Sequence, residues 1–282
     1  MTPDPDRPPW AHPGLSQVRL VATDLDGTLL DPNGRITERT ARAVAAARAN
    51  GIHVVPVTGR PPQATWAIAA AAGLGPLGVC ANGAVIVDLE RAEVIEISEI
   101  AGAIATGLVD LLRRAVPDIL LASDDLERFC YERGFFAGPV NWDEELEEVD
   151  DIRPVVATGC IKLIARTGET TALQLIELLE REVGEEGHVT TSGLDWVDIG
   201  APQVSKAYAL ERVCDRLGVG IDEVVAVGDN HNDLSVLAWA SSAMAPANAI
   251  PEVLAVVERV LPANSEDGVA CLLEELAGMP RR

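Results

Sequence analysis

The sequence predicts an α/β protein in which a doubly wound core, built on a parallel sheet, carries an inserted and smaller α+β domain. Segments of strand length alternate with helical segments at the start of the chain, and the same alternation returns near its end. This alternation is typical of parallel sheets, because each helix carries the chain back to the same end of the sheet. Between the two regions the pattern is mixed and more acidic. We therefore expect a flexible leader at 1–17, a core at 18–88 and 191–282, and an inserted domain at 89–190.

The first half of the core is predicted as strand, helix, strand, helix. The run VRLVAT, residues 18–23, is short, apolar and rich in β-branched residues, which suits a strand buried on both faces. Thr37 can cap the Ala-rich helix that follows at 38–50. The next strand is expected at 52–57 and the next helix at 61–73, with proline in the first turn of that helix.

The segment GVCANGAVIVD interrupts this rhythm with the pair Asn82-Gly83. Because Asn-Gly between two β-rich runs is a strong hairpin signal, antiparallel pairing is expected to begin here. The acidic run at 143–151 is expected to be a solvated loop. The remaining elements expected in the inserted domain are helices at 99–115 and 169–184 and a weak strand at 159–166.

The parallel pattern resumes after the inserted domain. The segment SKAYALERVCDRLG, residues 205–218, predicts a helix, and DEVVAVGD, residues 222–229, predicts a buried strand. A further helix is expected at 230–240. An aspartate therefore stands at the end of both strands: Asp24 after the first strand and Asp229 at the end of the late strand.

Composition and charge exclude some classes of partner. The 282 residues include 44 Asp or Glu and 22 Lys or Arg, which gives a formal net charge of -22. Such a surface repels nucleic acid and anionic membranes, so neither is expected as a partner. No run of ~20 apolar residues is present that could span a membrane. The five cysteines lack C-x-x-C spacing and indicate neither a disulfide framework nor a zinc site, so a cytoplasmic location is expected.

Polar side chains follow three of the predicted parallel strands, at the edge where the ligand crevice of an open sheet lies. These are Asp24 and Asp26 after the first strand, Thr58, Gly59 and Arg60 after the second, and Asp229, Asn232 and Asp233 after the late strand. Lys206, near the start of the helix expected at 205–218, after Gly200, would enter the same crevice if the second domain is an insertion. One site is thus expected to gather several carboxylates, a hydroxyl and an ammonium.

This set of side chains suits phosphoryl chemistry on a metal ion. Clustered aspartates without His or Cys favour Mg²⁺ over zinc, because Mg²⁺ is a hard cation that prefers oxygen ligands. A carboxylate can attack phosphorus and form an aspartyl-phosphate. A second carboxyl two residues along an extended chain lies on the same side, where it can protonate the leaving oxygen.

Taken together, these motifs resemble a known family. In chain order, DLDGTLL, VTGR, Lys206 and GDNHNDLSVL are similar to the four motifs of the haloacid dehalogenase (HAD) superfamily of phosphatases. The Asn-Gly turn, the large insertion after it and the tail NSEDGVACLLEEL resemble more narrowly the Cof-type subfamily with a class IIB cap. The resemblance implies a Rossmann-like HAD core at 18–88 and 191–282, with the inserted domain as an α+β cap.

The resemblance also implies roles for individual residues. Asp24 would be the nucleophile and Asp26 the general acid and base, with the backbone carbonyl of Asp26 on the metal. The metal-site residues would be Asp24, Asp26, Asp229 and Asp233, and the phosphate-binding residues Leu25, Thr58, Gly59, Lys206 and Asn232. Arg60 and Asn82 are candidates for the substrate side, although Asn82 can equally serve only the hairpin turn. Two places depart from the family pattern, Ala240-Ser241 and Ala245-Pro246, and both lie beyond the catalytic set.

The function expected is that of a Mg²⁺-dependent phosphohydrolase of small phosphomonoesters, acting through an aspartyl-phosphate. A phosphotransferase or phosphomutase on the same core is an alternative, in which the phosphoryl group passes to a sugar hydroxyl. A non-enzymatic receiver-like switch is a second alternative, because receivers also place Asp, Thr and Lys around Mg²⁺. Sugar phosphates, flavin mononucleotide and pyridoxal phosphate all stay open as substrates, and the sequence does not indicate the oligomeric state.

Overall fold

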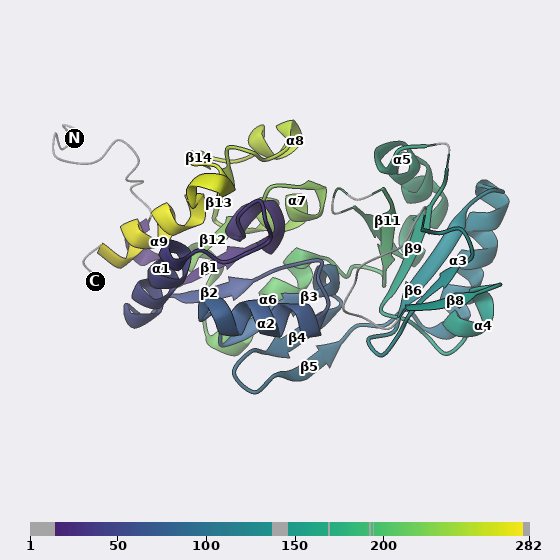
Figure 1. Ribbon diagram of the computed structural model, residues 1–282, viewed down its shortest axis with the longest axis horizontal. Coiled ribbons are helices and arrows are strands. Elements are labelled where there is room, and N and C mark those ends of the chain that lie inside the picture. The colour runs from purple at the N-terminus through teal and green to yellow at the C-terminus, as the bar shows by residue number, and fades with distance from the viewer. Residues whose placement is uncertain (1–14, 137–145, 169, 192, 194, 279–282) are drawn as a thin grey trace.

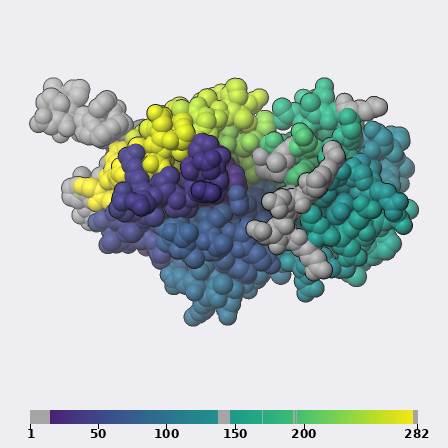
Figure 2. Space-filling view, in the orientation of Figure 1, coloured from purple at the N-terminus to yellow at the C-terminus, as the bar shows by residue number. Residues whose placement is uncertain are grey.

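The computed structural model shows a core and a second, inserted part that lie side by side (Figure 1). It describes residues 15–136, 146–168, 170–191, 193 and 195–278. The predicted leader falls outside these residues except for 15–17, where Leu15 is buried. In the space-filling view the purple and yellow ends of the chain share one lobe, and teal residues from the middle of the chain form the other (Figure 2).

The core contains a five-stranded sheet in which every neighbouring pair of strands is parallel, in the order β14-β13-β12-β1-β2. Its strands are β1 (Leu20–Thr23), β2 (His53–Pro56), β12 (Val224–Val227), β13 (Ser242–Pro246) and β14 (Arg259–Leu261). The central strand β1 pairs in register with both neighbours, so that Val21 lies between Val54 and Val225. The sheet is the parallel one that the alternating sequence pattern predicts.

Helices cover both faces of this sheet. They are α1 (Glu38–Ala49), α2 (Pro62–Ala72), α6 (Lys206–Leu217), α7 (Leu234–Trp239), α8 (Pro251–Leu254) and α9 (Gly268–Gly278). Alternate residues of β1 face opposite sides of the sheet. Val21 packs in a hydrophobic cluster with residues of α1 and α9. Leu20 packs in a second hydrophobic cluster, with residues of α6 and α7. The predicted cap of α1 is present, since the Thr37 side chain accepts from the Thr40 N–H. The doubly wound fold class is confirmed.

A three-stranded antiparallel sheet follows α2, in the order β3-β4-β5. Its strands are β3 (Leu77–Cys80), β4 (Val85–Asp88) and β5 (Glu93–Ile97). The hairpin predicted from Asn82-Gly83 is confirmed, because β3 and β4 pair on either side of that turn. Three successive turn residues have positive φ, namely Ala81, Asn82 and Gly83, and this tight reversal turns the Asn82 side chain toward the ends of the core strands.

The inserted part contains a six-stranded sheet in the order β10-β11-β9-β6-β7-β8, antiparallel except for the pair β7 and β8. Its strands are β6 (Leu120–Asp124), β7 (Phe129–Glu132), β8 (Leu146–Val149), β9 (Lys162–Arg166), β10 (His188–Thr190) and β11 (Val197–Gly200). Its helices are α3 (Gly102–Ala115), α4 (Arg153–Val156) and α5 (Ala172–Val183). The strand β8 lies in the acidic run predicted to be a loop, so that prediction is wrong for residues 146–149, and residues 143–145 lie outside the described part.

The two faces of the six-stranded sheet differ. One packs against α3 and α5 through an aliphatic cluster that includes Leu112 and Leu179. The other carries a group of aromatic rings, which are Phe129, Tyr131, Phe135, Phe136 and Trp196. Within the described part of the chain, no helix combines the length and apolarity needed to cross a membrane.

We propose domain boundaries that follow the sheets. The strand β5 pairs with β4 of the core hairpin, and β11 pairs with β9 of the inserted sheet. Boundaries near residues 98 and 200 keep each sheet whole, whereas the expected boundaries at 88 and 190 would divide both. The two connections between the parts are then 98–101 and 201–205.

Candidate active site

Two carboxylates lie at the same edge of the parallel sheet because their strands are neighbours in register. Asp24 directly follows β1, and Asp229 follows β12 after Gly228. The backbone N–H of Asp24 donates to the carbonyl of Val227 at 2.9 Å, which continues the strand pairing to this point. Asp24 and Asp229 are 6% and 8% exposed. Both side chains are thus held at the carboxyl edge of the sheet and are largely withdrawn from water.

The turn after Asp24 depends on Gly27. Its φ is +77°, and a Cβ atom built there would lie 2.4 Å from Oδ2 of Asp229. The next residue, Thr28, donates its hydroxyl to Oδ1 of Asp229 at 2.6 Å. The Asp-Gly-Thr sequence therefore brings the first strand-end turn into direct contact with the second carboxylate.

Replacing Gly27 by alanine is expected to lower the free energy of unfolding by more than about 2 kcal/mol, because backbone strain and the clash with Asp229 add together. Gly73→Ala is the matched control: Gly73 has φ +72°, and a Cβ atom built there would meet no neighbour within 4 Å, so only the strain of about 1 kcal/mol applies. Urea unfolding of both variants measures the difference. Equal losses would show that Gly27 serves the backbone alone.

A buried lysine bridges two carboxylates behind the crevice. Lys206 begins α6, whose cap Ser205 accepts from the N–H of Tyr208, and Lys206 is only 1% exposed. Its Nζ donates to Oδ1 of Asp24 at 2.7 Å and to Oδ1 of Asp233 at 2.6 Å. Burial by itself lowers the pKa of Lys206, but the two carboxylates outweigh burial and raise that pKa above its usual value. Lys206 is therefore a permanent cation in this site.

Asp233 is fixed by the backbone of its own motif. Its Oδ2 accepts from the N–H groups of Asp229 at 2.9 Å and Asn230 at 3.0 Å. Ligand oxygens of Asp24, Asp229 and Asp233 all lie within 4.8 Å of one another. Three carboxylates at this spacing, with oxygen as the only donor element, fit a hard divalent cation.

The electrostatics of this cluster favour a bound cation. Burial raises the pKa of Asp24 well above its usual value, Lys206 opposes that shift, and Asp233 and Asp229 add to it. Burial also raises the pKa of Asp229 to about 6, although its hydrogen bond from Thr28 opposes the shift. The carboxylates are thus hard to ionise together, and a divalent cation would offset their repulsion.

Asp26 lies apart from these three carboxylates. Both its oxygens accept from Arg60, from Nε and from Nη2, each at 2.6 Å. The Asp26 side chain is 56% exposed, so it is open to solvent. Its carboxylate is not in the cluster that could hold a metal, and the expected contact of its backbone carbonyl with the metal stays a prediction. Arg60 is the direct partner of Asp26, and its role on the substrate side stays a prediction.

The remaining predicted residues line the same crevice. Thr58 follows β2, is 1% exposed, and accepts from the N–H of Arg60 at 3.1 Å. Asn232 donates from Nδ2 to Oδ1 of Asn82 at 3.0 Å, and a Cβ atom on Gly59 would lie 3.0 Å from that same oxygen. Leu25 has its side chain in the core, so only its backbone could face a ligand.

Several residues that hold the site were not among the predicted site residues. The Nδ2 of Asn248 donates to the carbonyl of Gly27 at 2.7 Å. Asn264, in the predicted tail motif, donates from its backbone to Oδ1 of Asn248 at 2.8 Å and from Nδ2 to the carbonyl of Leu30 at 2.9 Å. Thr28 and Asn264 had a usable signal, because Thr28 directly follows Asp-Gly in the first motif and Asn264 begins the tail motif, whereas Asn248 had none.

The two departures from the expected motif pattern lie at the two ends of β13. Ser241 donates its hydroxyl to the carbonyl of Val224 at 2.9 Å, at the start of the neighbouring strand. Ala245 and Pro246 end β13, where both are buried. Ser241 thus lies at the start of β13, whereas Ala245 and Pro246 lie at its carboxyl end, beside the end of β12 that leads to Asp229.

Comparisons with known proteins agree with this geometry. The model of the haloacid dehalogenase-like hydrolase family matches residues 21–273. The chain is 29% identical over 267 residues to the pyridoxal phosphate phosphatase YbhA of Escherichia coli, covering 90% of this chain and 96% of that protein. Among solved structures, SMU.1108c of Streptococcus mutans superposes with a TM-score of 0.81 at 21% identity, over 93% of this chain and all of that one. The subclass IIB sugar phosphatase BT4131 superposes with a TM-score of 0.76 at 19% identity, over 91% of this chain and 98% of that chain.

Proposed function

This chain belongs to the haloacid dehalogenase-like hydrolase family and is a phosphatase, and we propose that it hydrolyses small phosphomonoesters with Mg²⁺ through an aspartyl-phosphate on Asp24. One observation carries the proposal. The buried carboxylate of Asp24 accepts from the ammonium of Lys206 and lies close to two further carboxylates, Asp229 and Asp233, at the ligand edge of the sheet. This arrangement places a nucleophile, a fixed cation and a metal-ligand set around one point.

The metal would be held by Asp24 and Asp229, with Asp233 beside them and the backbone carbonyl of Asp26 as a further ligand. Bound Mg²⁺ would neutralise charge on the phosphoryl oxygens and on the carboxylates that face them. Thr28 keeps Asp229 turned toward this position through its hydrogen bond. The protein therefore supplies an all-oxygen site, which suits Mg²⁺.

In the first chemical step, an oxygen of Asp24 attacks phosphorus, a bond from Asp24 to phosphorus forms, and the ester P–O bond breaks. The leaving oxygen takes a proton from the carboxyl group of Asp26. In the second step, water gives a proton to Asp26 and its oxygen bonds to phosphorus, while the bond to Asp24 breaks and phosphate is released. Both oxygens of Asp26 accept hydrogen bonds from Arg60. The Asp26 side chain must therefore turn away from Arg60 before it can transfer a proton.

The phosphoryl oxygens would be bound by groups from three elements. Thr58 and the backbone of Gly59 follow β2, Lys206 begins α6, and Asn232 follows β12. The backbone of Leu25 lies beside Asp24 and completes the set. Donors from separate elements can surround the equatorial oxygens, where charge spreads in the transition state.

Small metabolites are the proposed substrates. The E. coli relative is named a pyridoxal phosphate phosphatase and BT4131 a sugar phosphatase, so both ligand classes belong in the test. A panel of sugar phosphates, pyridoxal phosphate and flavin mononucleotide, assayed for released phosphate with Mg²⁺, tests the proposal. Release from at least one member supports it, and transfer of the phosphoryl group to a second sugar without release would favour a phosphotransferase instead. The receiver-like alternative is set aside because the chain is a phosphatase.

Removal of Mg²⁺ is expected to abolish turnover, and the apparent affinity for Mg²⁺ is expected to depend on pH. In the metal-free protein the pKa of Asp229 is about 6. Protons therefore compete with the metal below about pH 6, and the affinity should fall by up to about tenfold per pH unit there. Titration calorimetry with MgCl₂ at pH 5, 6 and 7.5 measures this. An affinity that is flat across this range would contradict the assignment of Asp229 as a ligand.

We also propose that the enzyme works in the reducing cytoplasm. The five cysteines are free thiols, and four of them are buried. Burial raises the pKa of Cys80 to about 12, so this thiol is held in its unreactive protonated form. Fractionation of the native cells, followed by an assay of each fraction, tests the location.

A further inference from the structure

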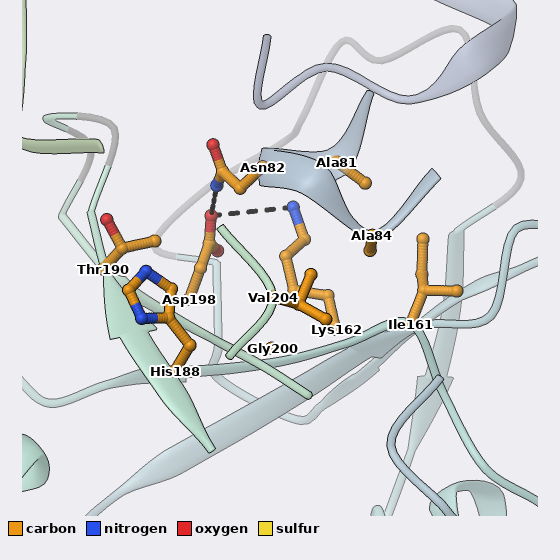
Figure 3. Close-up of a pocket in the computed structure, with 10 residues that line it drawn as sticks. All are labelled: Ala81, Asn82, Ala84, Ile161, Lys162, His188, Thr190, Asp198, Gly200 and Val204. Atoms are coloured by element: carbon orange, nitrogen blue, oxygen red, sulfur yellow. Dashed lines mark hydrogen bonds and ion pairs between the residues drawn. The ribbon is translucent and has the colours of Figure 1, made fainter. Parts of the chain in front are cut away.

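A chain of hydrogen bonds links the phosphate side of the crevice to the inserted sheet. Asn232 donates from Nδ2 to Oδ1 of Asn82 at 3.0 Å, and Asn82 donates from Nδ2 to Oδ2 of Asp198 at 2.9 Å. Figure 3 shows the carboxylate of Asp198 directed toward Asn82 and Lys162. Asp198 belongs to β11 of the six-stranded sheet, whereas Asn82 lies in the hairpin turn of the core. The second hydrogen bond therefore joins the two parts of the molecule.

The chemistry of these three groups permits one orientation of both amides. An ionised carboxylate only accepts, so Asn82 must turn its NH₂ group toward Asp198. Its carbonyl oxygen then faces Asn232, which must turn its own NH₂ group toward that oxygen. This hydrogen bond also fixes the direction of the second hydrogen of the Asn232 NH₂ group.

The backbone prevents Asn82 from adapting by moving. Asn82 has φ of +56°, and the preceding Ala81 has φ of +49°. A Cβ atom on the next residue, Gly83, would lie 2.2 Å from the carbonyl oxygen of Ser205, so the turn packs directly against the start of α6. Asparagine is among the few residues other than glycine that adopt this left-handed conformation readily. The Asn82 amide is thus held on a rigid support.

The burial of Asp198 is expected to lower the stability of the folded protein, because one of its carboxylate oxygens lacks a hydrogen bond. It is 3% exposed, and its Oδ1 atom has no hydrogen-bond partner among the described residues. Lys162 Nζ lies 3.7 Å from Oδ2. Burial raises the pKa of Asp198 and Asp124 adds to that rise, while Lys162 and the hydrogen bond from Asn82 oppose it by stabilising the carboxylate. A buried carboxylate with one unpaired oxygen is retained here at a cost of stability.

We propose that Asp198 is a positioning residue for phosphate binding: through Asn82 it orients the amide of Asn232, so that Asn232 presents an N–H to the phosphoryl group. This inference rests on the proposed function, in which Asn232 binds phosphate. Because Asp198 lies in the inserted sheet, the correct orientation is imposed only while that sheet lies against the hairpin. The position of the inserted part is thereby coupled to the affinity for the phosphoryl group.

A double-mutant experiment with inorganic phosphate as the probe tests the relay. Asp198→Asn keeps the shape of the side chain but can donate, so the Asn82 amide is free to turn over. At pH 8 with Mg²⁺ present, titration calorimetry should show phosphate binding about fivefold weaker, as expected for loss of one orienting hydrogen bond. In an Asn232→Ala background the same substitution should change the affinity by less than about twofold, because the amide that it positions is gone.

A second variant and a matched control keep the test decisive. Asn82→Gly preserves the left-handed backbone and removes the amide, and it should weaken phosphate binding at least as much as Asp198→Asn. Glu132→Gln removes a buried carboxylate of the same sheet, one that accepts from the N–H groups of Leu121 at 3.1 Å and Ile152 at 3.0 Å and does not contact the relay, and it should leave the affinity within about twofold.

The outcomes separate the relay from the proposed function. If Asp198→Asn weakens binding equally with and without Asn232, or not at all, the relay is wrong while the phosphatase site stands. If Asn232→Ala itself leaves phosphate binding unchanged, the proposed phosphate site is wrong, and the relay is overturned together with it.

Discussion

Replacing Asp24 by asparagine is expected to lower kcat by at least about 10⁴-fold, because the amide cannot form the bond to phosphorus. The variant keeps the shape of the side chain, and its amide oxygen can still accept from Lys206. Turnover of the best substrate in the phosphomonoester panel, measured with saturating Mg²⁺, gives the loss. A variant that retained a tenth of the wild-type kcat would exclude Asp24 as the nucleophile.

The same substitution should leave the fold intact and, without metal, make it slightly more stable. Burial and the neighbouring Asp233 and Asp229 raise the pKa of Asp24, which means that its ionised form is disfavoured in the folded protein. The neutral amide of Asn at this position removes the charge repulsion with Asp233 and Asp229. Thermal unfolding in EDTA should therefore give a midpoint at or above that of the wild type, and Asp124→Asn, which removes a buried carboxylate of the inserted sheet, controls for the loss of one charge. A large fall in the midpoint would attribute lost activity to unfolding and not to chemistry.

The parallel core was predictable because its strands and helices carry strong local patterns. The run at 18–23 contains β1, and the helix predicted at 38–50 is α1 at Glu38–Ala49 with the expected Thr37 cap. Likewise, the segment predicted as a buried strand at 222–229 contains β12 at Val224–Val227. A strand buried on both faces needs consecutive apolar residues, and this is the signal that a single sequence shows most clearly.

The inserted sheet was predicted poorly for the opposite reason. Its edge strand β8 reads Leu-Glu-Glu-Val, with both glutamates exposed, so composition alone indicated a loop. The strand β8 is stabilised by parallel pairing with β7, in which Phe129 lies opposite Leu146. These two residues are not neighbours in the sequence. Such tertiary pairing overrides local propensity, and no local pattern reports it.

The positions of Asp24 and Asp229 were predictable because each follows a strand, whereas the partners of other site residues were not. Asp24 and Asp229 meet because β1 and β12 are neighbours, as the predicted topology requires. The pairing of Asp26 with Arg60 depends on side-chain rotamers. The contact of Asp198 with Asn82 depends on how the inserted part lies against the core, which sequence patterns do not encode.

Replacing Lys206 is expected to have a large effect on the stability of the folded protein. Lys206→Met is expected to lower the free energy of unfolding by about 3–5 kcal/mol in EDTA at pH 8, because removal of one partner leaves buried carboxylates without a counter-charge. Asp24 and Asp233, which accept from Lys206, are 6% and 1% exposed, so water cannot replace it. Urea unfolding measures the loss, and the double variant Lys206→Met/Asp233→Asn should recover part of it.

The loss should also shrink as the pH falls. In the folded protein the pKa of Asp24 is raised by burial, and removal of Lys206 takes away the interaction that opposes that shift. A carboxyl group whose pKa is higher in the folded state binds more protons there, so the folded state gains stability as the pH decreases and loses it as the pH rises through that pKa. The difference from wild type should therefore be smaller at pH 5.5 than at pH 8, and Mg²⁺ at pH 8 should reduce it in the same way by supplying a cation. A loss that is equal at both pH values, and unchanged by Asp233→Asn or by Mg²⁺, would show that Lys206 stabilises the core through the packing of its aliphatic chain and not through its charge.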